Sequence, residues 1–250
     1  MKNAIIKKVH KAYIKGDDKR FRAIQSRYAP NSLIKFCNGK YDEKGNNVYL
    51  DSLINGKLWL SLPFAFNDPF DALHNIDCEE LARKSFDDLV FKEFKYKKPK
   101  YINRTEKEKL ITSWTNRYKD TFSHIKNNTY MTCFSEKTNL ISDSMWGYYA
   151  NNHKGFCVEY DFATLSKYSI MPVLYTKKYS ILNVARKNTR EFSIGITFNK
   201  AIEWNHEKEW RIISSSMVDT KEQPGVYSNQ QTDGYIFGLS SFGTVAKRYD

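Results

Sequence analysis

The sequence predicts an α+β fold, in which a mainly antiparallel sheet and a block of helices occupy different parts of the chain. Five short runs in the second half alternate apolar and polar residues and end at turn residues, as half-buried strands do. The middle of the chain, residues 78–128, instead repeats its apolar residues at helical spacing. Strands and helices that are segregated in this way are typical of the α+β class.

The composition is that of a folded protein with a basic surface. The chain has 250 residues, of which 41% are hydrophobic, and this is enough to bury a substantial core. Its 40 lysines and arginines against 28 acidic residues give a net charge of +12, which favours polyanionic partners such as RNA or DNA. A lysine-rich genome would give the same balance, so the charge alone leaves the partner open.

Cysteine and histidine spacing argues against metal sites. The four cysteines stand far apart and form no CxxC pair, so we expect reduced thiols and no structural zinc. The five histidines show no HxH, HxxxH or HExxH spacing, and no metal ligand is predicted. No apolar run is long enough for a signal peptide or a membrane span, so we expect a cytoplasmic protein without a membrane partner.

The first part of the chain predicts a basic helical arm and the start of the sheet. Residues 1–30 form the arm, which is either a docking element or the first packed helix, and residues 31–250 form a single domain. The domain begins with a strand, a helix that ends at Gly56 and a strand that ends at Pro63, over residues 32–36, 47–55 and 58–63.

The helical block is predicted to be an insertion that covers the sheet or shapes the rim of a cleft. One amphipathic helix spans residues 79–95, and a second begins at Thr105, where Glu108 completes a capping box. A short helix follows over residues 142–151, and residues 183–204 form one long helix or two, because Gly195 weakens the middle. The five strands are expected over residues 130–135, 155–161, 170–175, 209–214 and 235–238.

Residues 145–161 carry the densest group of ligand-binding side chains, in the sequence MWGYYANNHKGFCVEYD. Trp146, Tyr148, Tyr149, His153 and Lys154 fall within nine positions. Indole, phenol, imidazole and ammonium groups side by side are typical of a pocket that stacks on a planar ligand and binds its polar edges. The alternatives are an aromatic-rich core and, for His153, a cap on the helix end.

Two further segments are predicted to form walls of the same pocket. Residues 58–71, LWLSLPFAFNDPFD, bring Ser61, Asn67 and Asp68 to a cleft edge, with Phe70 exposed in the turn, unless Asn67 and Asp68 merely cap a rigid turn. The strand YMTCFSE ends at Ser135, at the start of the polar loop that leads to Trp146.

The segment WNHEKEWRII, residues 204–213, predicts a pair of carboxylates. If a strand starts at Glu209, alternation puts Glu207, Glu209 and Arg211 on one face and core residues on the other. Like-charge repulsion raises the pKa of at least one of two adjacent carboxyl groups. Such a pair suits a sugar hydroxyl or an oxocarbenium-like centre. A surface ion-pair cluster is the alternative.

These motifs together resemble the bacterial family catalogued as "domain of unknown function 2971". The resemblance covers about residues 32–238. It depends on the ordered motifs LIKF, NGKLWLSLPFAFNDPFD, CFSE, MWGYYANNHKGFCVEYD and EKEWRI.

The chain also resembles ADP-ribosyltransferases, which implies a split, mainly antiparallel sheet around a central cleft that binds NAD as the substrate. In that resemblance Lys35 stands on the first strand, where those enzymes have Arg or His, and Ser61 on a middle strand. Glu209 is the late catalytic glutamate and Glu207 completes its E-x-E pair. The implied NAD-binding residues are Lys35, Ser61, Asn67, Asp68, Phe70, Ser135, Trp146, Tyr149 and His153.

The resemblance further implies a toxin or phage-defence effector that modifies nucleic acid or protein, with an antitoxin or regulatory protein as partner. Two other functions fit the residues. One is a hydrolase or nuclease that uses Glu207, Glu209, His153 and Asp68. The other is a protein that binds a ligand or nucleic acid without turnover.

Overall fold

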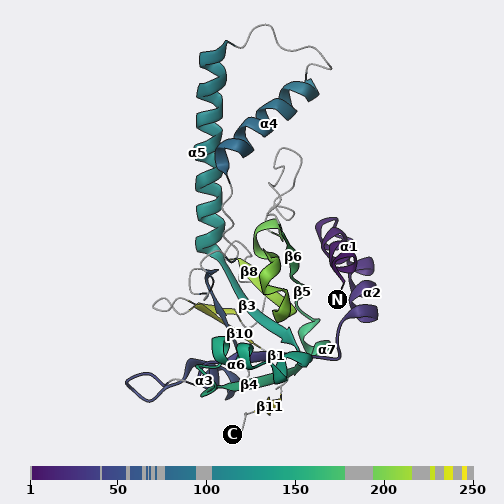
Figure 1. Ribbon diagram of the computed structural model, residues 1–250, viewed down its shortest axis with the longest axis vertical. Helices are drawn as coiled ribbons and strands as arrows, with labels where there is room; N and C mark the ends of the chain where they lie inside the picture. Colours follow the sequence, from purple (N-terminus) through teal and green to yellow (C-terminus); the bar gives the residue numbers. More distant parts are fainter. Residues whose placement is uncertain are drawn as a thin grey trace.

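The computed structural model describes residues 2–39, 41–54, 57–63, 66, 68, 71, 77–93, 103–177, 194–215, 226–228, 234–238 and 244–246. Helices and an antiparallel sheet occupy separate regions (Figure 1), which confirms the α+β class. The described helices include none that is both long and apolar enough to cross a membrane.

One sheet of nine strands organises the described residues. Its main path runs β11-β4-β1-β3-β2-β10-β9, β8 joins at β3, and β5 joins at β8. All of these pairs are antiparallel. The strands are β1 (Ser32–Cys37), β2 (Lys57–Ser61), β3 (Thr129–Glu136), β4 (Phe156–Asp161), β5 (Met171–Pro172), β8 (Glu209–Ser215), β9 (Val226–Ser228), β10 (Gly234–Gly238) and β11 (Thr244–Ala246).

Strand β3 is the centre of the sheet, and its two edges differ. One edge pairs with β8 over its length, from Thr129 opposite Ser215 to Ser135 opposite Glu209. The other edge meets β1 at Ser135 and Glu136 and meets β2 at Met131. Strands β1 and β2 therefore diverge along this edge of β3, and the described sheet has no strand opposite residues 132–134.

The helices are α1 (Asn3–Ile14), α2 (Asp18–Tyr28), α3 (Val48–Ile54), α4 (Cys78–Glu93), α5 (Arg104–Asn128), α6 (Asp143–Tyr149) and α7 (Phe162–Leu165). Helices α4 and α5 form a hairpin that extends away from the sheet (Figure 1). The predicted capping box was shifted by two residues. Asn103, not Thr105, is the N-cap of α5, and its side chain accepts from Glu106 N at 2.8 Å.

Helices α1 and α2 pack against the rest of the structure. Val9, Ala12 and Phe21 form one core cluster with Met171 and Phe198. Polar bonds add to this contact, because the His10 ring bonds Pro172 O at 2.8 Å and Gln25 Nε2 donates to Ile170 O at 2.6 Å. Helices α1 and α2 are therefore packed on the domain through their apolar faces.

The main core lies between the sheet and α7. Trp210 and Ile212 of β8 face this core with Phe134 and Tyr160, as the alternation along residues 204–213 predicted. Aromatic rings meet edge to face there, for example Trp210 with Phe162 at a centroid distance of 5.3 Å. Because the side chains on one face of β8 pack into this core, those on its other face point to the opposite side of the sheet.

Two predicted elements were wrong in part. The run over residues 170–175 is divided into β5 and β6 (Leu174–Thr176). The long helix over residues 183–204 does not continue to its predicted end, because β7 (Asn199–Ala201) and the 3-10 helix η4 (Ile202–Glu207) occupy residues 199–207. Strand β7 pairs in parallel with β6, so tertiary pairing overrides the local helical pattern. Residues 183–193 lie outside the described residues.

Candidate functional site

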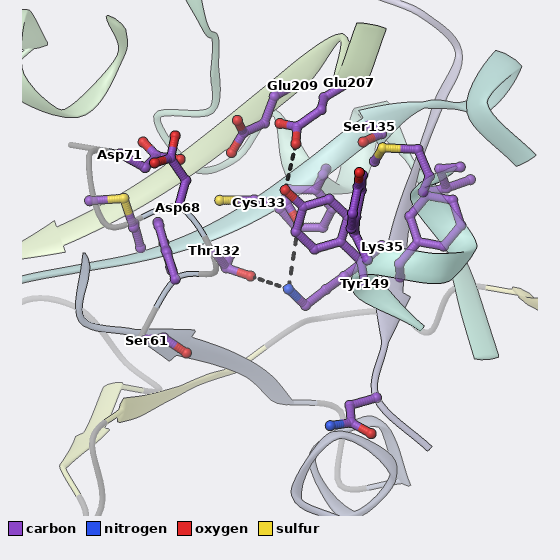
Figure 2. Close-up of a pocket in the computed structure, with 18 of the residues that line it drawn as sticks. Lys35, Ser61, Asp68, Asp71, Thr132, Cys133, Ser135, Tyr149, Glu207 and Glu209 are labelled. Carbon is purple, nitrogen blue, oxygen red and sulfur yellow. Dashed lines mark hydrogen bonds between the residues drawn. The ribbon is translucent and has the colours of Figure 1, made fainter. Parts of the chain in front are cut away.

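A cavity of about 620 Å³ opens where β1 and β2 diverge from β3, and Figure 2 shows the residues around it. Its size lies in the range of pockets that hold small molecules. All three segments singled out in the sequence contribute to its lining. The lining residues from these segments are Trp59, Ser61, Phe66, Asp68, Asp71, Met145, Gly147, Tyr148, Tyr149, Asn151, Asn152, Glu207 and Glu209.

The cavity brings together most of the predicted site residues. The ones that line it are Lys35, Ser61, Asp68, Ser135, Tyr149, Glu207 and Glu209. Two others, Trp146 and His153, are described but are not among the lining residues. Asn67 and Phe70 lie outside the described residues.

Trp146 supports the cavity wall from behind. Its side chain is 2% exposed and packs with Ile34, Ala150 and Cys157. The indole Nε1 donates to Leu140 O at 2.7 Å, and the ring meets Phe36 edge to face. The predicted stacking of Trp146 on a ligand is therefore corrected, because both its faces and its N–H are used inside the protein.

The turn that follows α6 is held in an unusual backbone conformation. Asn151, Asn152 and His153 have φ values of 49°, 52° and 67°, in the left-handed region. A Cβ at Gly155 would lie 2.2 Å from Cys37 O, so only glycine allows the turn to approach β1 this closely. His153 is exposed, and its backbone N–H donates to Trp146 O at 3.3 Å in the turn that follows α6.

A buried cluster of charges forms one wall of the cavity. It contains three carboxylates and two cations, none more than 4% exposed: Asp71, Glu207, Glu209, Lys200 and Arg211. This excludes the surface ion-pair alternative, because a surface cluster would be open to solvent.

Arg211 is the fixed centre of this cluster. Its Nη2 donates to both oxygens of Asp71 at 2.7 and 2.6 Å, and its Nε donates to Glu209 Oε1 at 2.8 Å. The remaining nitrogen, Nη1, donates to Thr197 O at 2.7 Å. With its planar fork saturated, the guanidinium holds Asp71 and Glu209 in one geometry.

Lys200 joins all three carboxylates. Its Nζ lies 2.6 Å from Glu207 Oε2, 3.1 Å from Asp71 Oδ2 and 3.2 Å from Glu209 Oε2. Three buried carboxylates against two cations leave one negative charge in excess if every group is ionised. Because an uncompensated buried charge is costly, one carboxyl group is expected to hold a proton at neutral pH.

The two glutamates have opposite pKa shifts. Burial raises the pKa of Glu207, the charge of Glu209 raises it further, and Lys200 and Tyr149 offset this only partly, so the pKa is about 7. Burial also acts to raise the pKa of Glu209. There, however, Arg211 and Lys200 outweigh it and hold the pKa well below its usual range. Glu209 is thus the ionised member of the pair and Glu207 the one that exchanges a proton.

Tyr149 connects helix α6 to the glutamate pair (Figure 2). Its hydroxyl donates to Glu207 Oε1 at 2.5 Å. Burial and the charge of Glu207 raise the pKa of Tyr149, so the phenol keeps its proton and remains a donor. Tyr175 makes a comparable contact behind the pair, since its hydroxyl accepts from Glu209 N at 2.8 Å.

Lys35 lies apart from the carboxylates. Its Nζ donates to Thr132 Oγ1 at 2.7 Å and to Cys133 O at 3.5 Å (Figure 2). No carboxylate in the described part of the chain lies within salt-bridge distance of it. Lys35 is therefore a cation of the cavity lining that can meet an anionic group of a ligand.

Sequence reasoning missed Lys200 and did not select Asp71. Lys200 fell inside the long predicted helix, and only the pairing of β7 with β6 reveals that it faces the glutamates. Asp71 ends the motif NDPFD and could have been chosen there, although nothing in the sequence indicates that Arg211 is its partner.

The clustered carboxylates face Lys200 and Arg211, not one another. Within the described ranges, no group of three or more His, Cys, Asp and Glu side chains could hold a metal ion. The chemistry that the cluster itself offers is proton exchange beside a fixed negative charge.

Comparison with known proteins gives one match. No curated protein and no solved structure matches the chain. The model of the family described as "Protein of unknown function (DUF2971)" matches residues 145–212, a stretch that includes most of α6 and Glu207, Glu209 and Arg211. This match confirms the resemblance over residues 145–212, which contain the motifs MWGYYANNHKGFCVEYD and EKEWRI and carry the sequence pattern of the DUF2971 family.

Proposed function

We propose that the cavity is an active site in which Glu207 and Glu209 break a glycosidic bond, and that the bond is the nicotinamide–ribose bond of NAD. The observation that carries this proposal is that the pKa values of the two glutamates are shifted in opposite directions. One has a pKa of about 7 and the other is held ionised beside it. Pairs of carboxyl groups whose surroundings separate their pKa values supply the acid–base and charge-stabilising roles of glycosyl chemistry.

The rest of the lining supports a dinucleotide substrate. Phe36, Tyr49, Trp59 and Tyr148 offer aromatic surface for planar rings. The amides of Asn38, Asn151 and Asn152 offer polar contacts, and Lys35 offers a positive charge for a phosphate group.

In the proposed reaction the bond between the ribose C1 and the nicotinamide nitrogen breaks, and its electron pair remains on nicotinamide, which leaves as a neutral molecule. The ionised Glu209 stabilises the positive charge that develops on the ribose ring. The acceptor oxygen forms a bond to C1 and gives its proton to the Glu207 carboxylate. The products are nicotinamide and an ADP-ribosylated acceptor, and Glu207 later returns the proton to water.

Three further residues position the pair. Tyr149 orients Glu207 through the 2.5 Å hydrogen bond, Lys200 bridges the two glutamates, and Arg211 keeps Glu209 ionised. An activity of this kind on nucleic acid or protein accords with a toxin or defence role, in which a partner protein would neutralise the enzyme.

The test is incubation of the purified protein with labelled NAD and with RNA, DNA or cell lysate as acceptor. Glu207→Gln and Glu209→Gln are expected to lower label transfer or nicotinamide release by about 10²–10⁴-fold. The matched control is Glu203→Gln, since Glu203 is an exposed glutamate on the same 3-10 helix and should leave turnover unchanged. Circular dichroism and thermal melting verify that each variant is folded.

Three outcomes are informative. Label on an acceptor that is lost in the two site variants supports transfer, and release of free ADP-ribose under the same conditions makes water the acceptor. Folded protein that binds NAD in calorimetry but never turns it over would replace the enzyme with a binding protein. Failure both to bind and to turn over NAD would overturn the choice of substrate.

A further inference from the structure

The positive charge of the protein is concentrated on α1 and α2. Residues 2–28 contain nine lysines and arginines against two aspartates, a net charge of +7 out of +12 for the whole chain. The nine basic residues are all exposed: Lys2, Lys7, Lys8, Lys11, Lys15, Lys19, Arg20, Arg22 and Arg27. More than half of the net charge of the chain therefore lies on these two helices, and their nine exposed basic residues are called the α1–α2 surface below.

The lysines of α1 form a row. Lys7 and Lys11, with Lys15 at the C-cap, recur every four residues, so successive members lie about 6 Å apart along the helix axis. Lys8 falls beside them, within an arc of about 100°. The opposite face of α1 is apolar and is buried through residues such as Val9 and Ala12.

This row is not explained by the stability of the fold. None of the nine basic residues has a carboxylate of the described structure within salt-bridge distance. Like charges four residues apart destabilise a helix. The contacts that do exist leave charge available: Arg22 Nη1 donates to Ser166 O at 2.6 Å, and the Arg27 guanidinium lies 5.3 Å from the Tyr28 ring centroid.

We propose that the α1–α2 surface binds the phosphodiester backbone of single-stranded nucleic acid. A row of exposed lysines that has no carboxylate partner among the described residues releases counterions when it meets a chain of phosphates. Tyr28, 43% exposed and next to Arg27, provides a ring on which an unpaired base stacks. This surface lies on helices that do not line the cavity, so the proposal does not depend on the reaction proposed there.

An anionic membrane fits this surface less well. Helices that bind in a membrane interface insert an apolar face beside their basic residues. In α1 that face is already covered by Met171 and Phe198. Among the large hydrophobic side chains that are exposed in the described structure, Tyr28 is the member from α1 and α2.

The experiment is fluorescence anisotropy with a labelled 20-nucleotide RNA, DNA of the same sequence and the corresponding duplex, over a range of NaCl concentrations. The test variant is Lys7→Gln, Lys11→Gln, Lys15→Gln. The control variant, Lys44→Gln, Lys109→Gln, Lys119→Gln, removes the same charge from three exposed lysines elsewhere.

The test variant should bind single strands at least about tenfold more weakly at low salt, and its slope of log affinity against log salt should fall by about 2 units. The control variant should keep the slope of the natural protein. Tyr28→Ala should weaken single strands by about tenfold and the duplex much less. RNA and DNA arms show which polymer is preferred.

Three results would overturn the proposal. Equal losses in the test and control variants would make the binding a general effect of charge. Unchanged affinity in the folded test variant would exclude the α1–α2 surface. Binding to phosphatidylserine vesicles without binding to any of the three nucleic acids would assign the surface to membranes.

Discussion

Two arginines in this protein each bind two carboxylates, and their surroundings make them different. Arg211 bonds Asp71 and Glu209 beside the cavity, and all three side chains are at most 4% exposed. Arg83 bonds Glu79 and Glu108 between α4 and α5, where the side chains are 43%, 60% and 46% exposed. The shortest N–O distances are nearly the same, 2.6 and 2.8 Å.

The comparison shows that the distances within an ion pair do not by themselves determine how strongly its charges interact. Around Arg83, water screens the charges, and the pair adds at most a modest link between two helices. Around Arg211, removal from water makes each charge felt strongly by its neighbours, and this sets the protonation of Glu207 and Glu209. The same residue types thus build a helix contact in one place and a reactive environment in the other.

The largest expected effect comes from breaking the buried group. Arg211→Met leaves Lys200 as the one remaining cation beside Asp71 and Glu209 among the described residues and should lower the free energy of unfolding by about 3–5 kcal/mol. Arg83→Met is the matched exposed substitution and should leave the urea midpoint nearly unchanged. Equal shifts of the two midpoints in urea titrations would contradict the distinction between the two arginines.

The next effect concerns two buried groups whose titrations oppose each other. Burial lowers the pKa of His10 from 6.5 to about 4, whereas the Pro172 carbonyl only partly offsets this. The contribution of the neutral His10 side chain to the free energy of unfolding is therefore complete above pH 6.5 and is lost as the pH falls toward 4. Over this interval Glu207→Gln, which removes the opposing titration of Glu207, should lose on the order of 3 kcal/mol.

The raised pKa of Glu207 acts in the opposite direction. Its folded carboxyl group binds a proton below about pH 7 and its unfolded one only near 4.5, so this group favours the folded state increasingly as the pH falls. The free energy of unfolding of His10→Leu should therefore increase as the pH falls from 7 to 4.5, whereas that of the natural protein should change little. Chemical unfolding at four pH values measures how the free energy of unfolding of Glu207→Gln, His10→Leu and the natural protein depends on pH. The same pH dependence in all three would contradict opposite contributions from His10 and Glu207.

A smaller effect tests the hydrogen bond between Tyr149 and Glu207. If Glu207 acts as the base, activity should rise with pH through about 7. The Tyr149 hydroxyl helps to lower the pKa of Glu207, so Tyr149→Phe should move this rise to higher pH. Tyr148→Phe is the control on the same helix. A pH–rate profile that does not move in Tyr149→Phe would mean that another group limits the reaction.

The smallest effect concerns the exposed helical hairpin. Asn103→Ala removes the observed cap of α5 and should cost about 1 kcal/mol of stability. Thr105→Ala, at the position expected from the sequence, should cost nothing comparable. A larger loss of stability for Thr105→Ala would mean that Thr105 is the N-cap, as predicted from the sequence.

The sequence predicted the parts of the fold that depend on local patterns. Alternation along residues 209–214 defined both faces of β8, and the polar end of YMTCFSE marked the end of β3. The unusual composition of residues 58–71, 145–161 and 204–213 indicated the three segments that line one cavity. Each of these inferences needs only residues that are neighbours in the chain or share one strand.

What the sequence did not reveal depends on distant contacts. Lys200 reaches the glutamates through β7, whose pairing with β6 is set by residues 25 positions away. Trp146 was chosen for its ring, but whether a ring faces a ligand or a core is decided by which neighbours cover it, here Phe36 and Leu140. Burial of the charges, which gives the cluster its chemistry, was the feature least visible in the sequence.

The surplus of one carboxylate over the cations in the cluster has a thermodynamic consequence for binding. A ligand that brings a positive charge next to Glu207 can take the place of the proton held there, so its association would be accompanied by proton release. The affinity for such a ligand would then increase as the pH rises through about 7. Its apparent enthalpy would also vary with the ionisation enthalpy of the buffer, which makes proton exchange measurable even before any reaction is known.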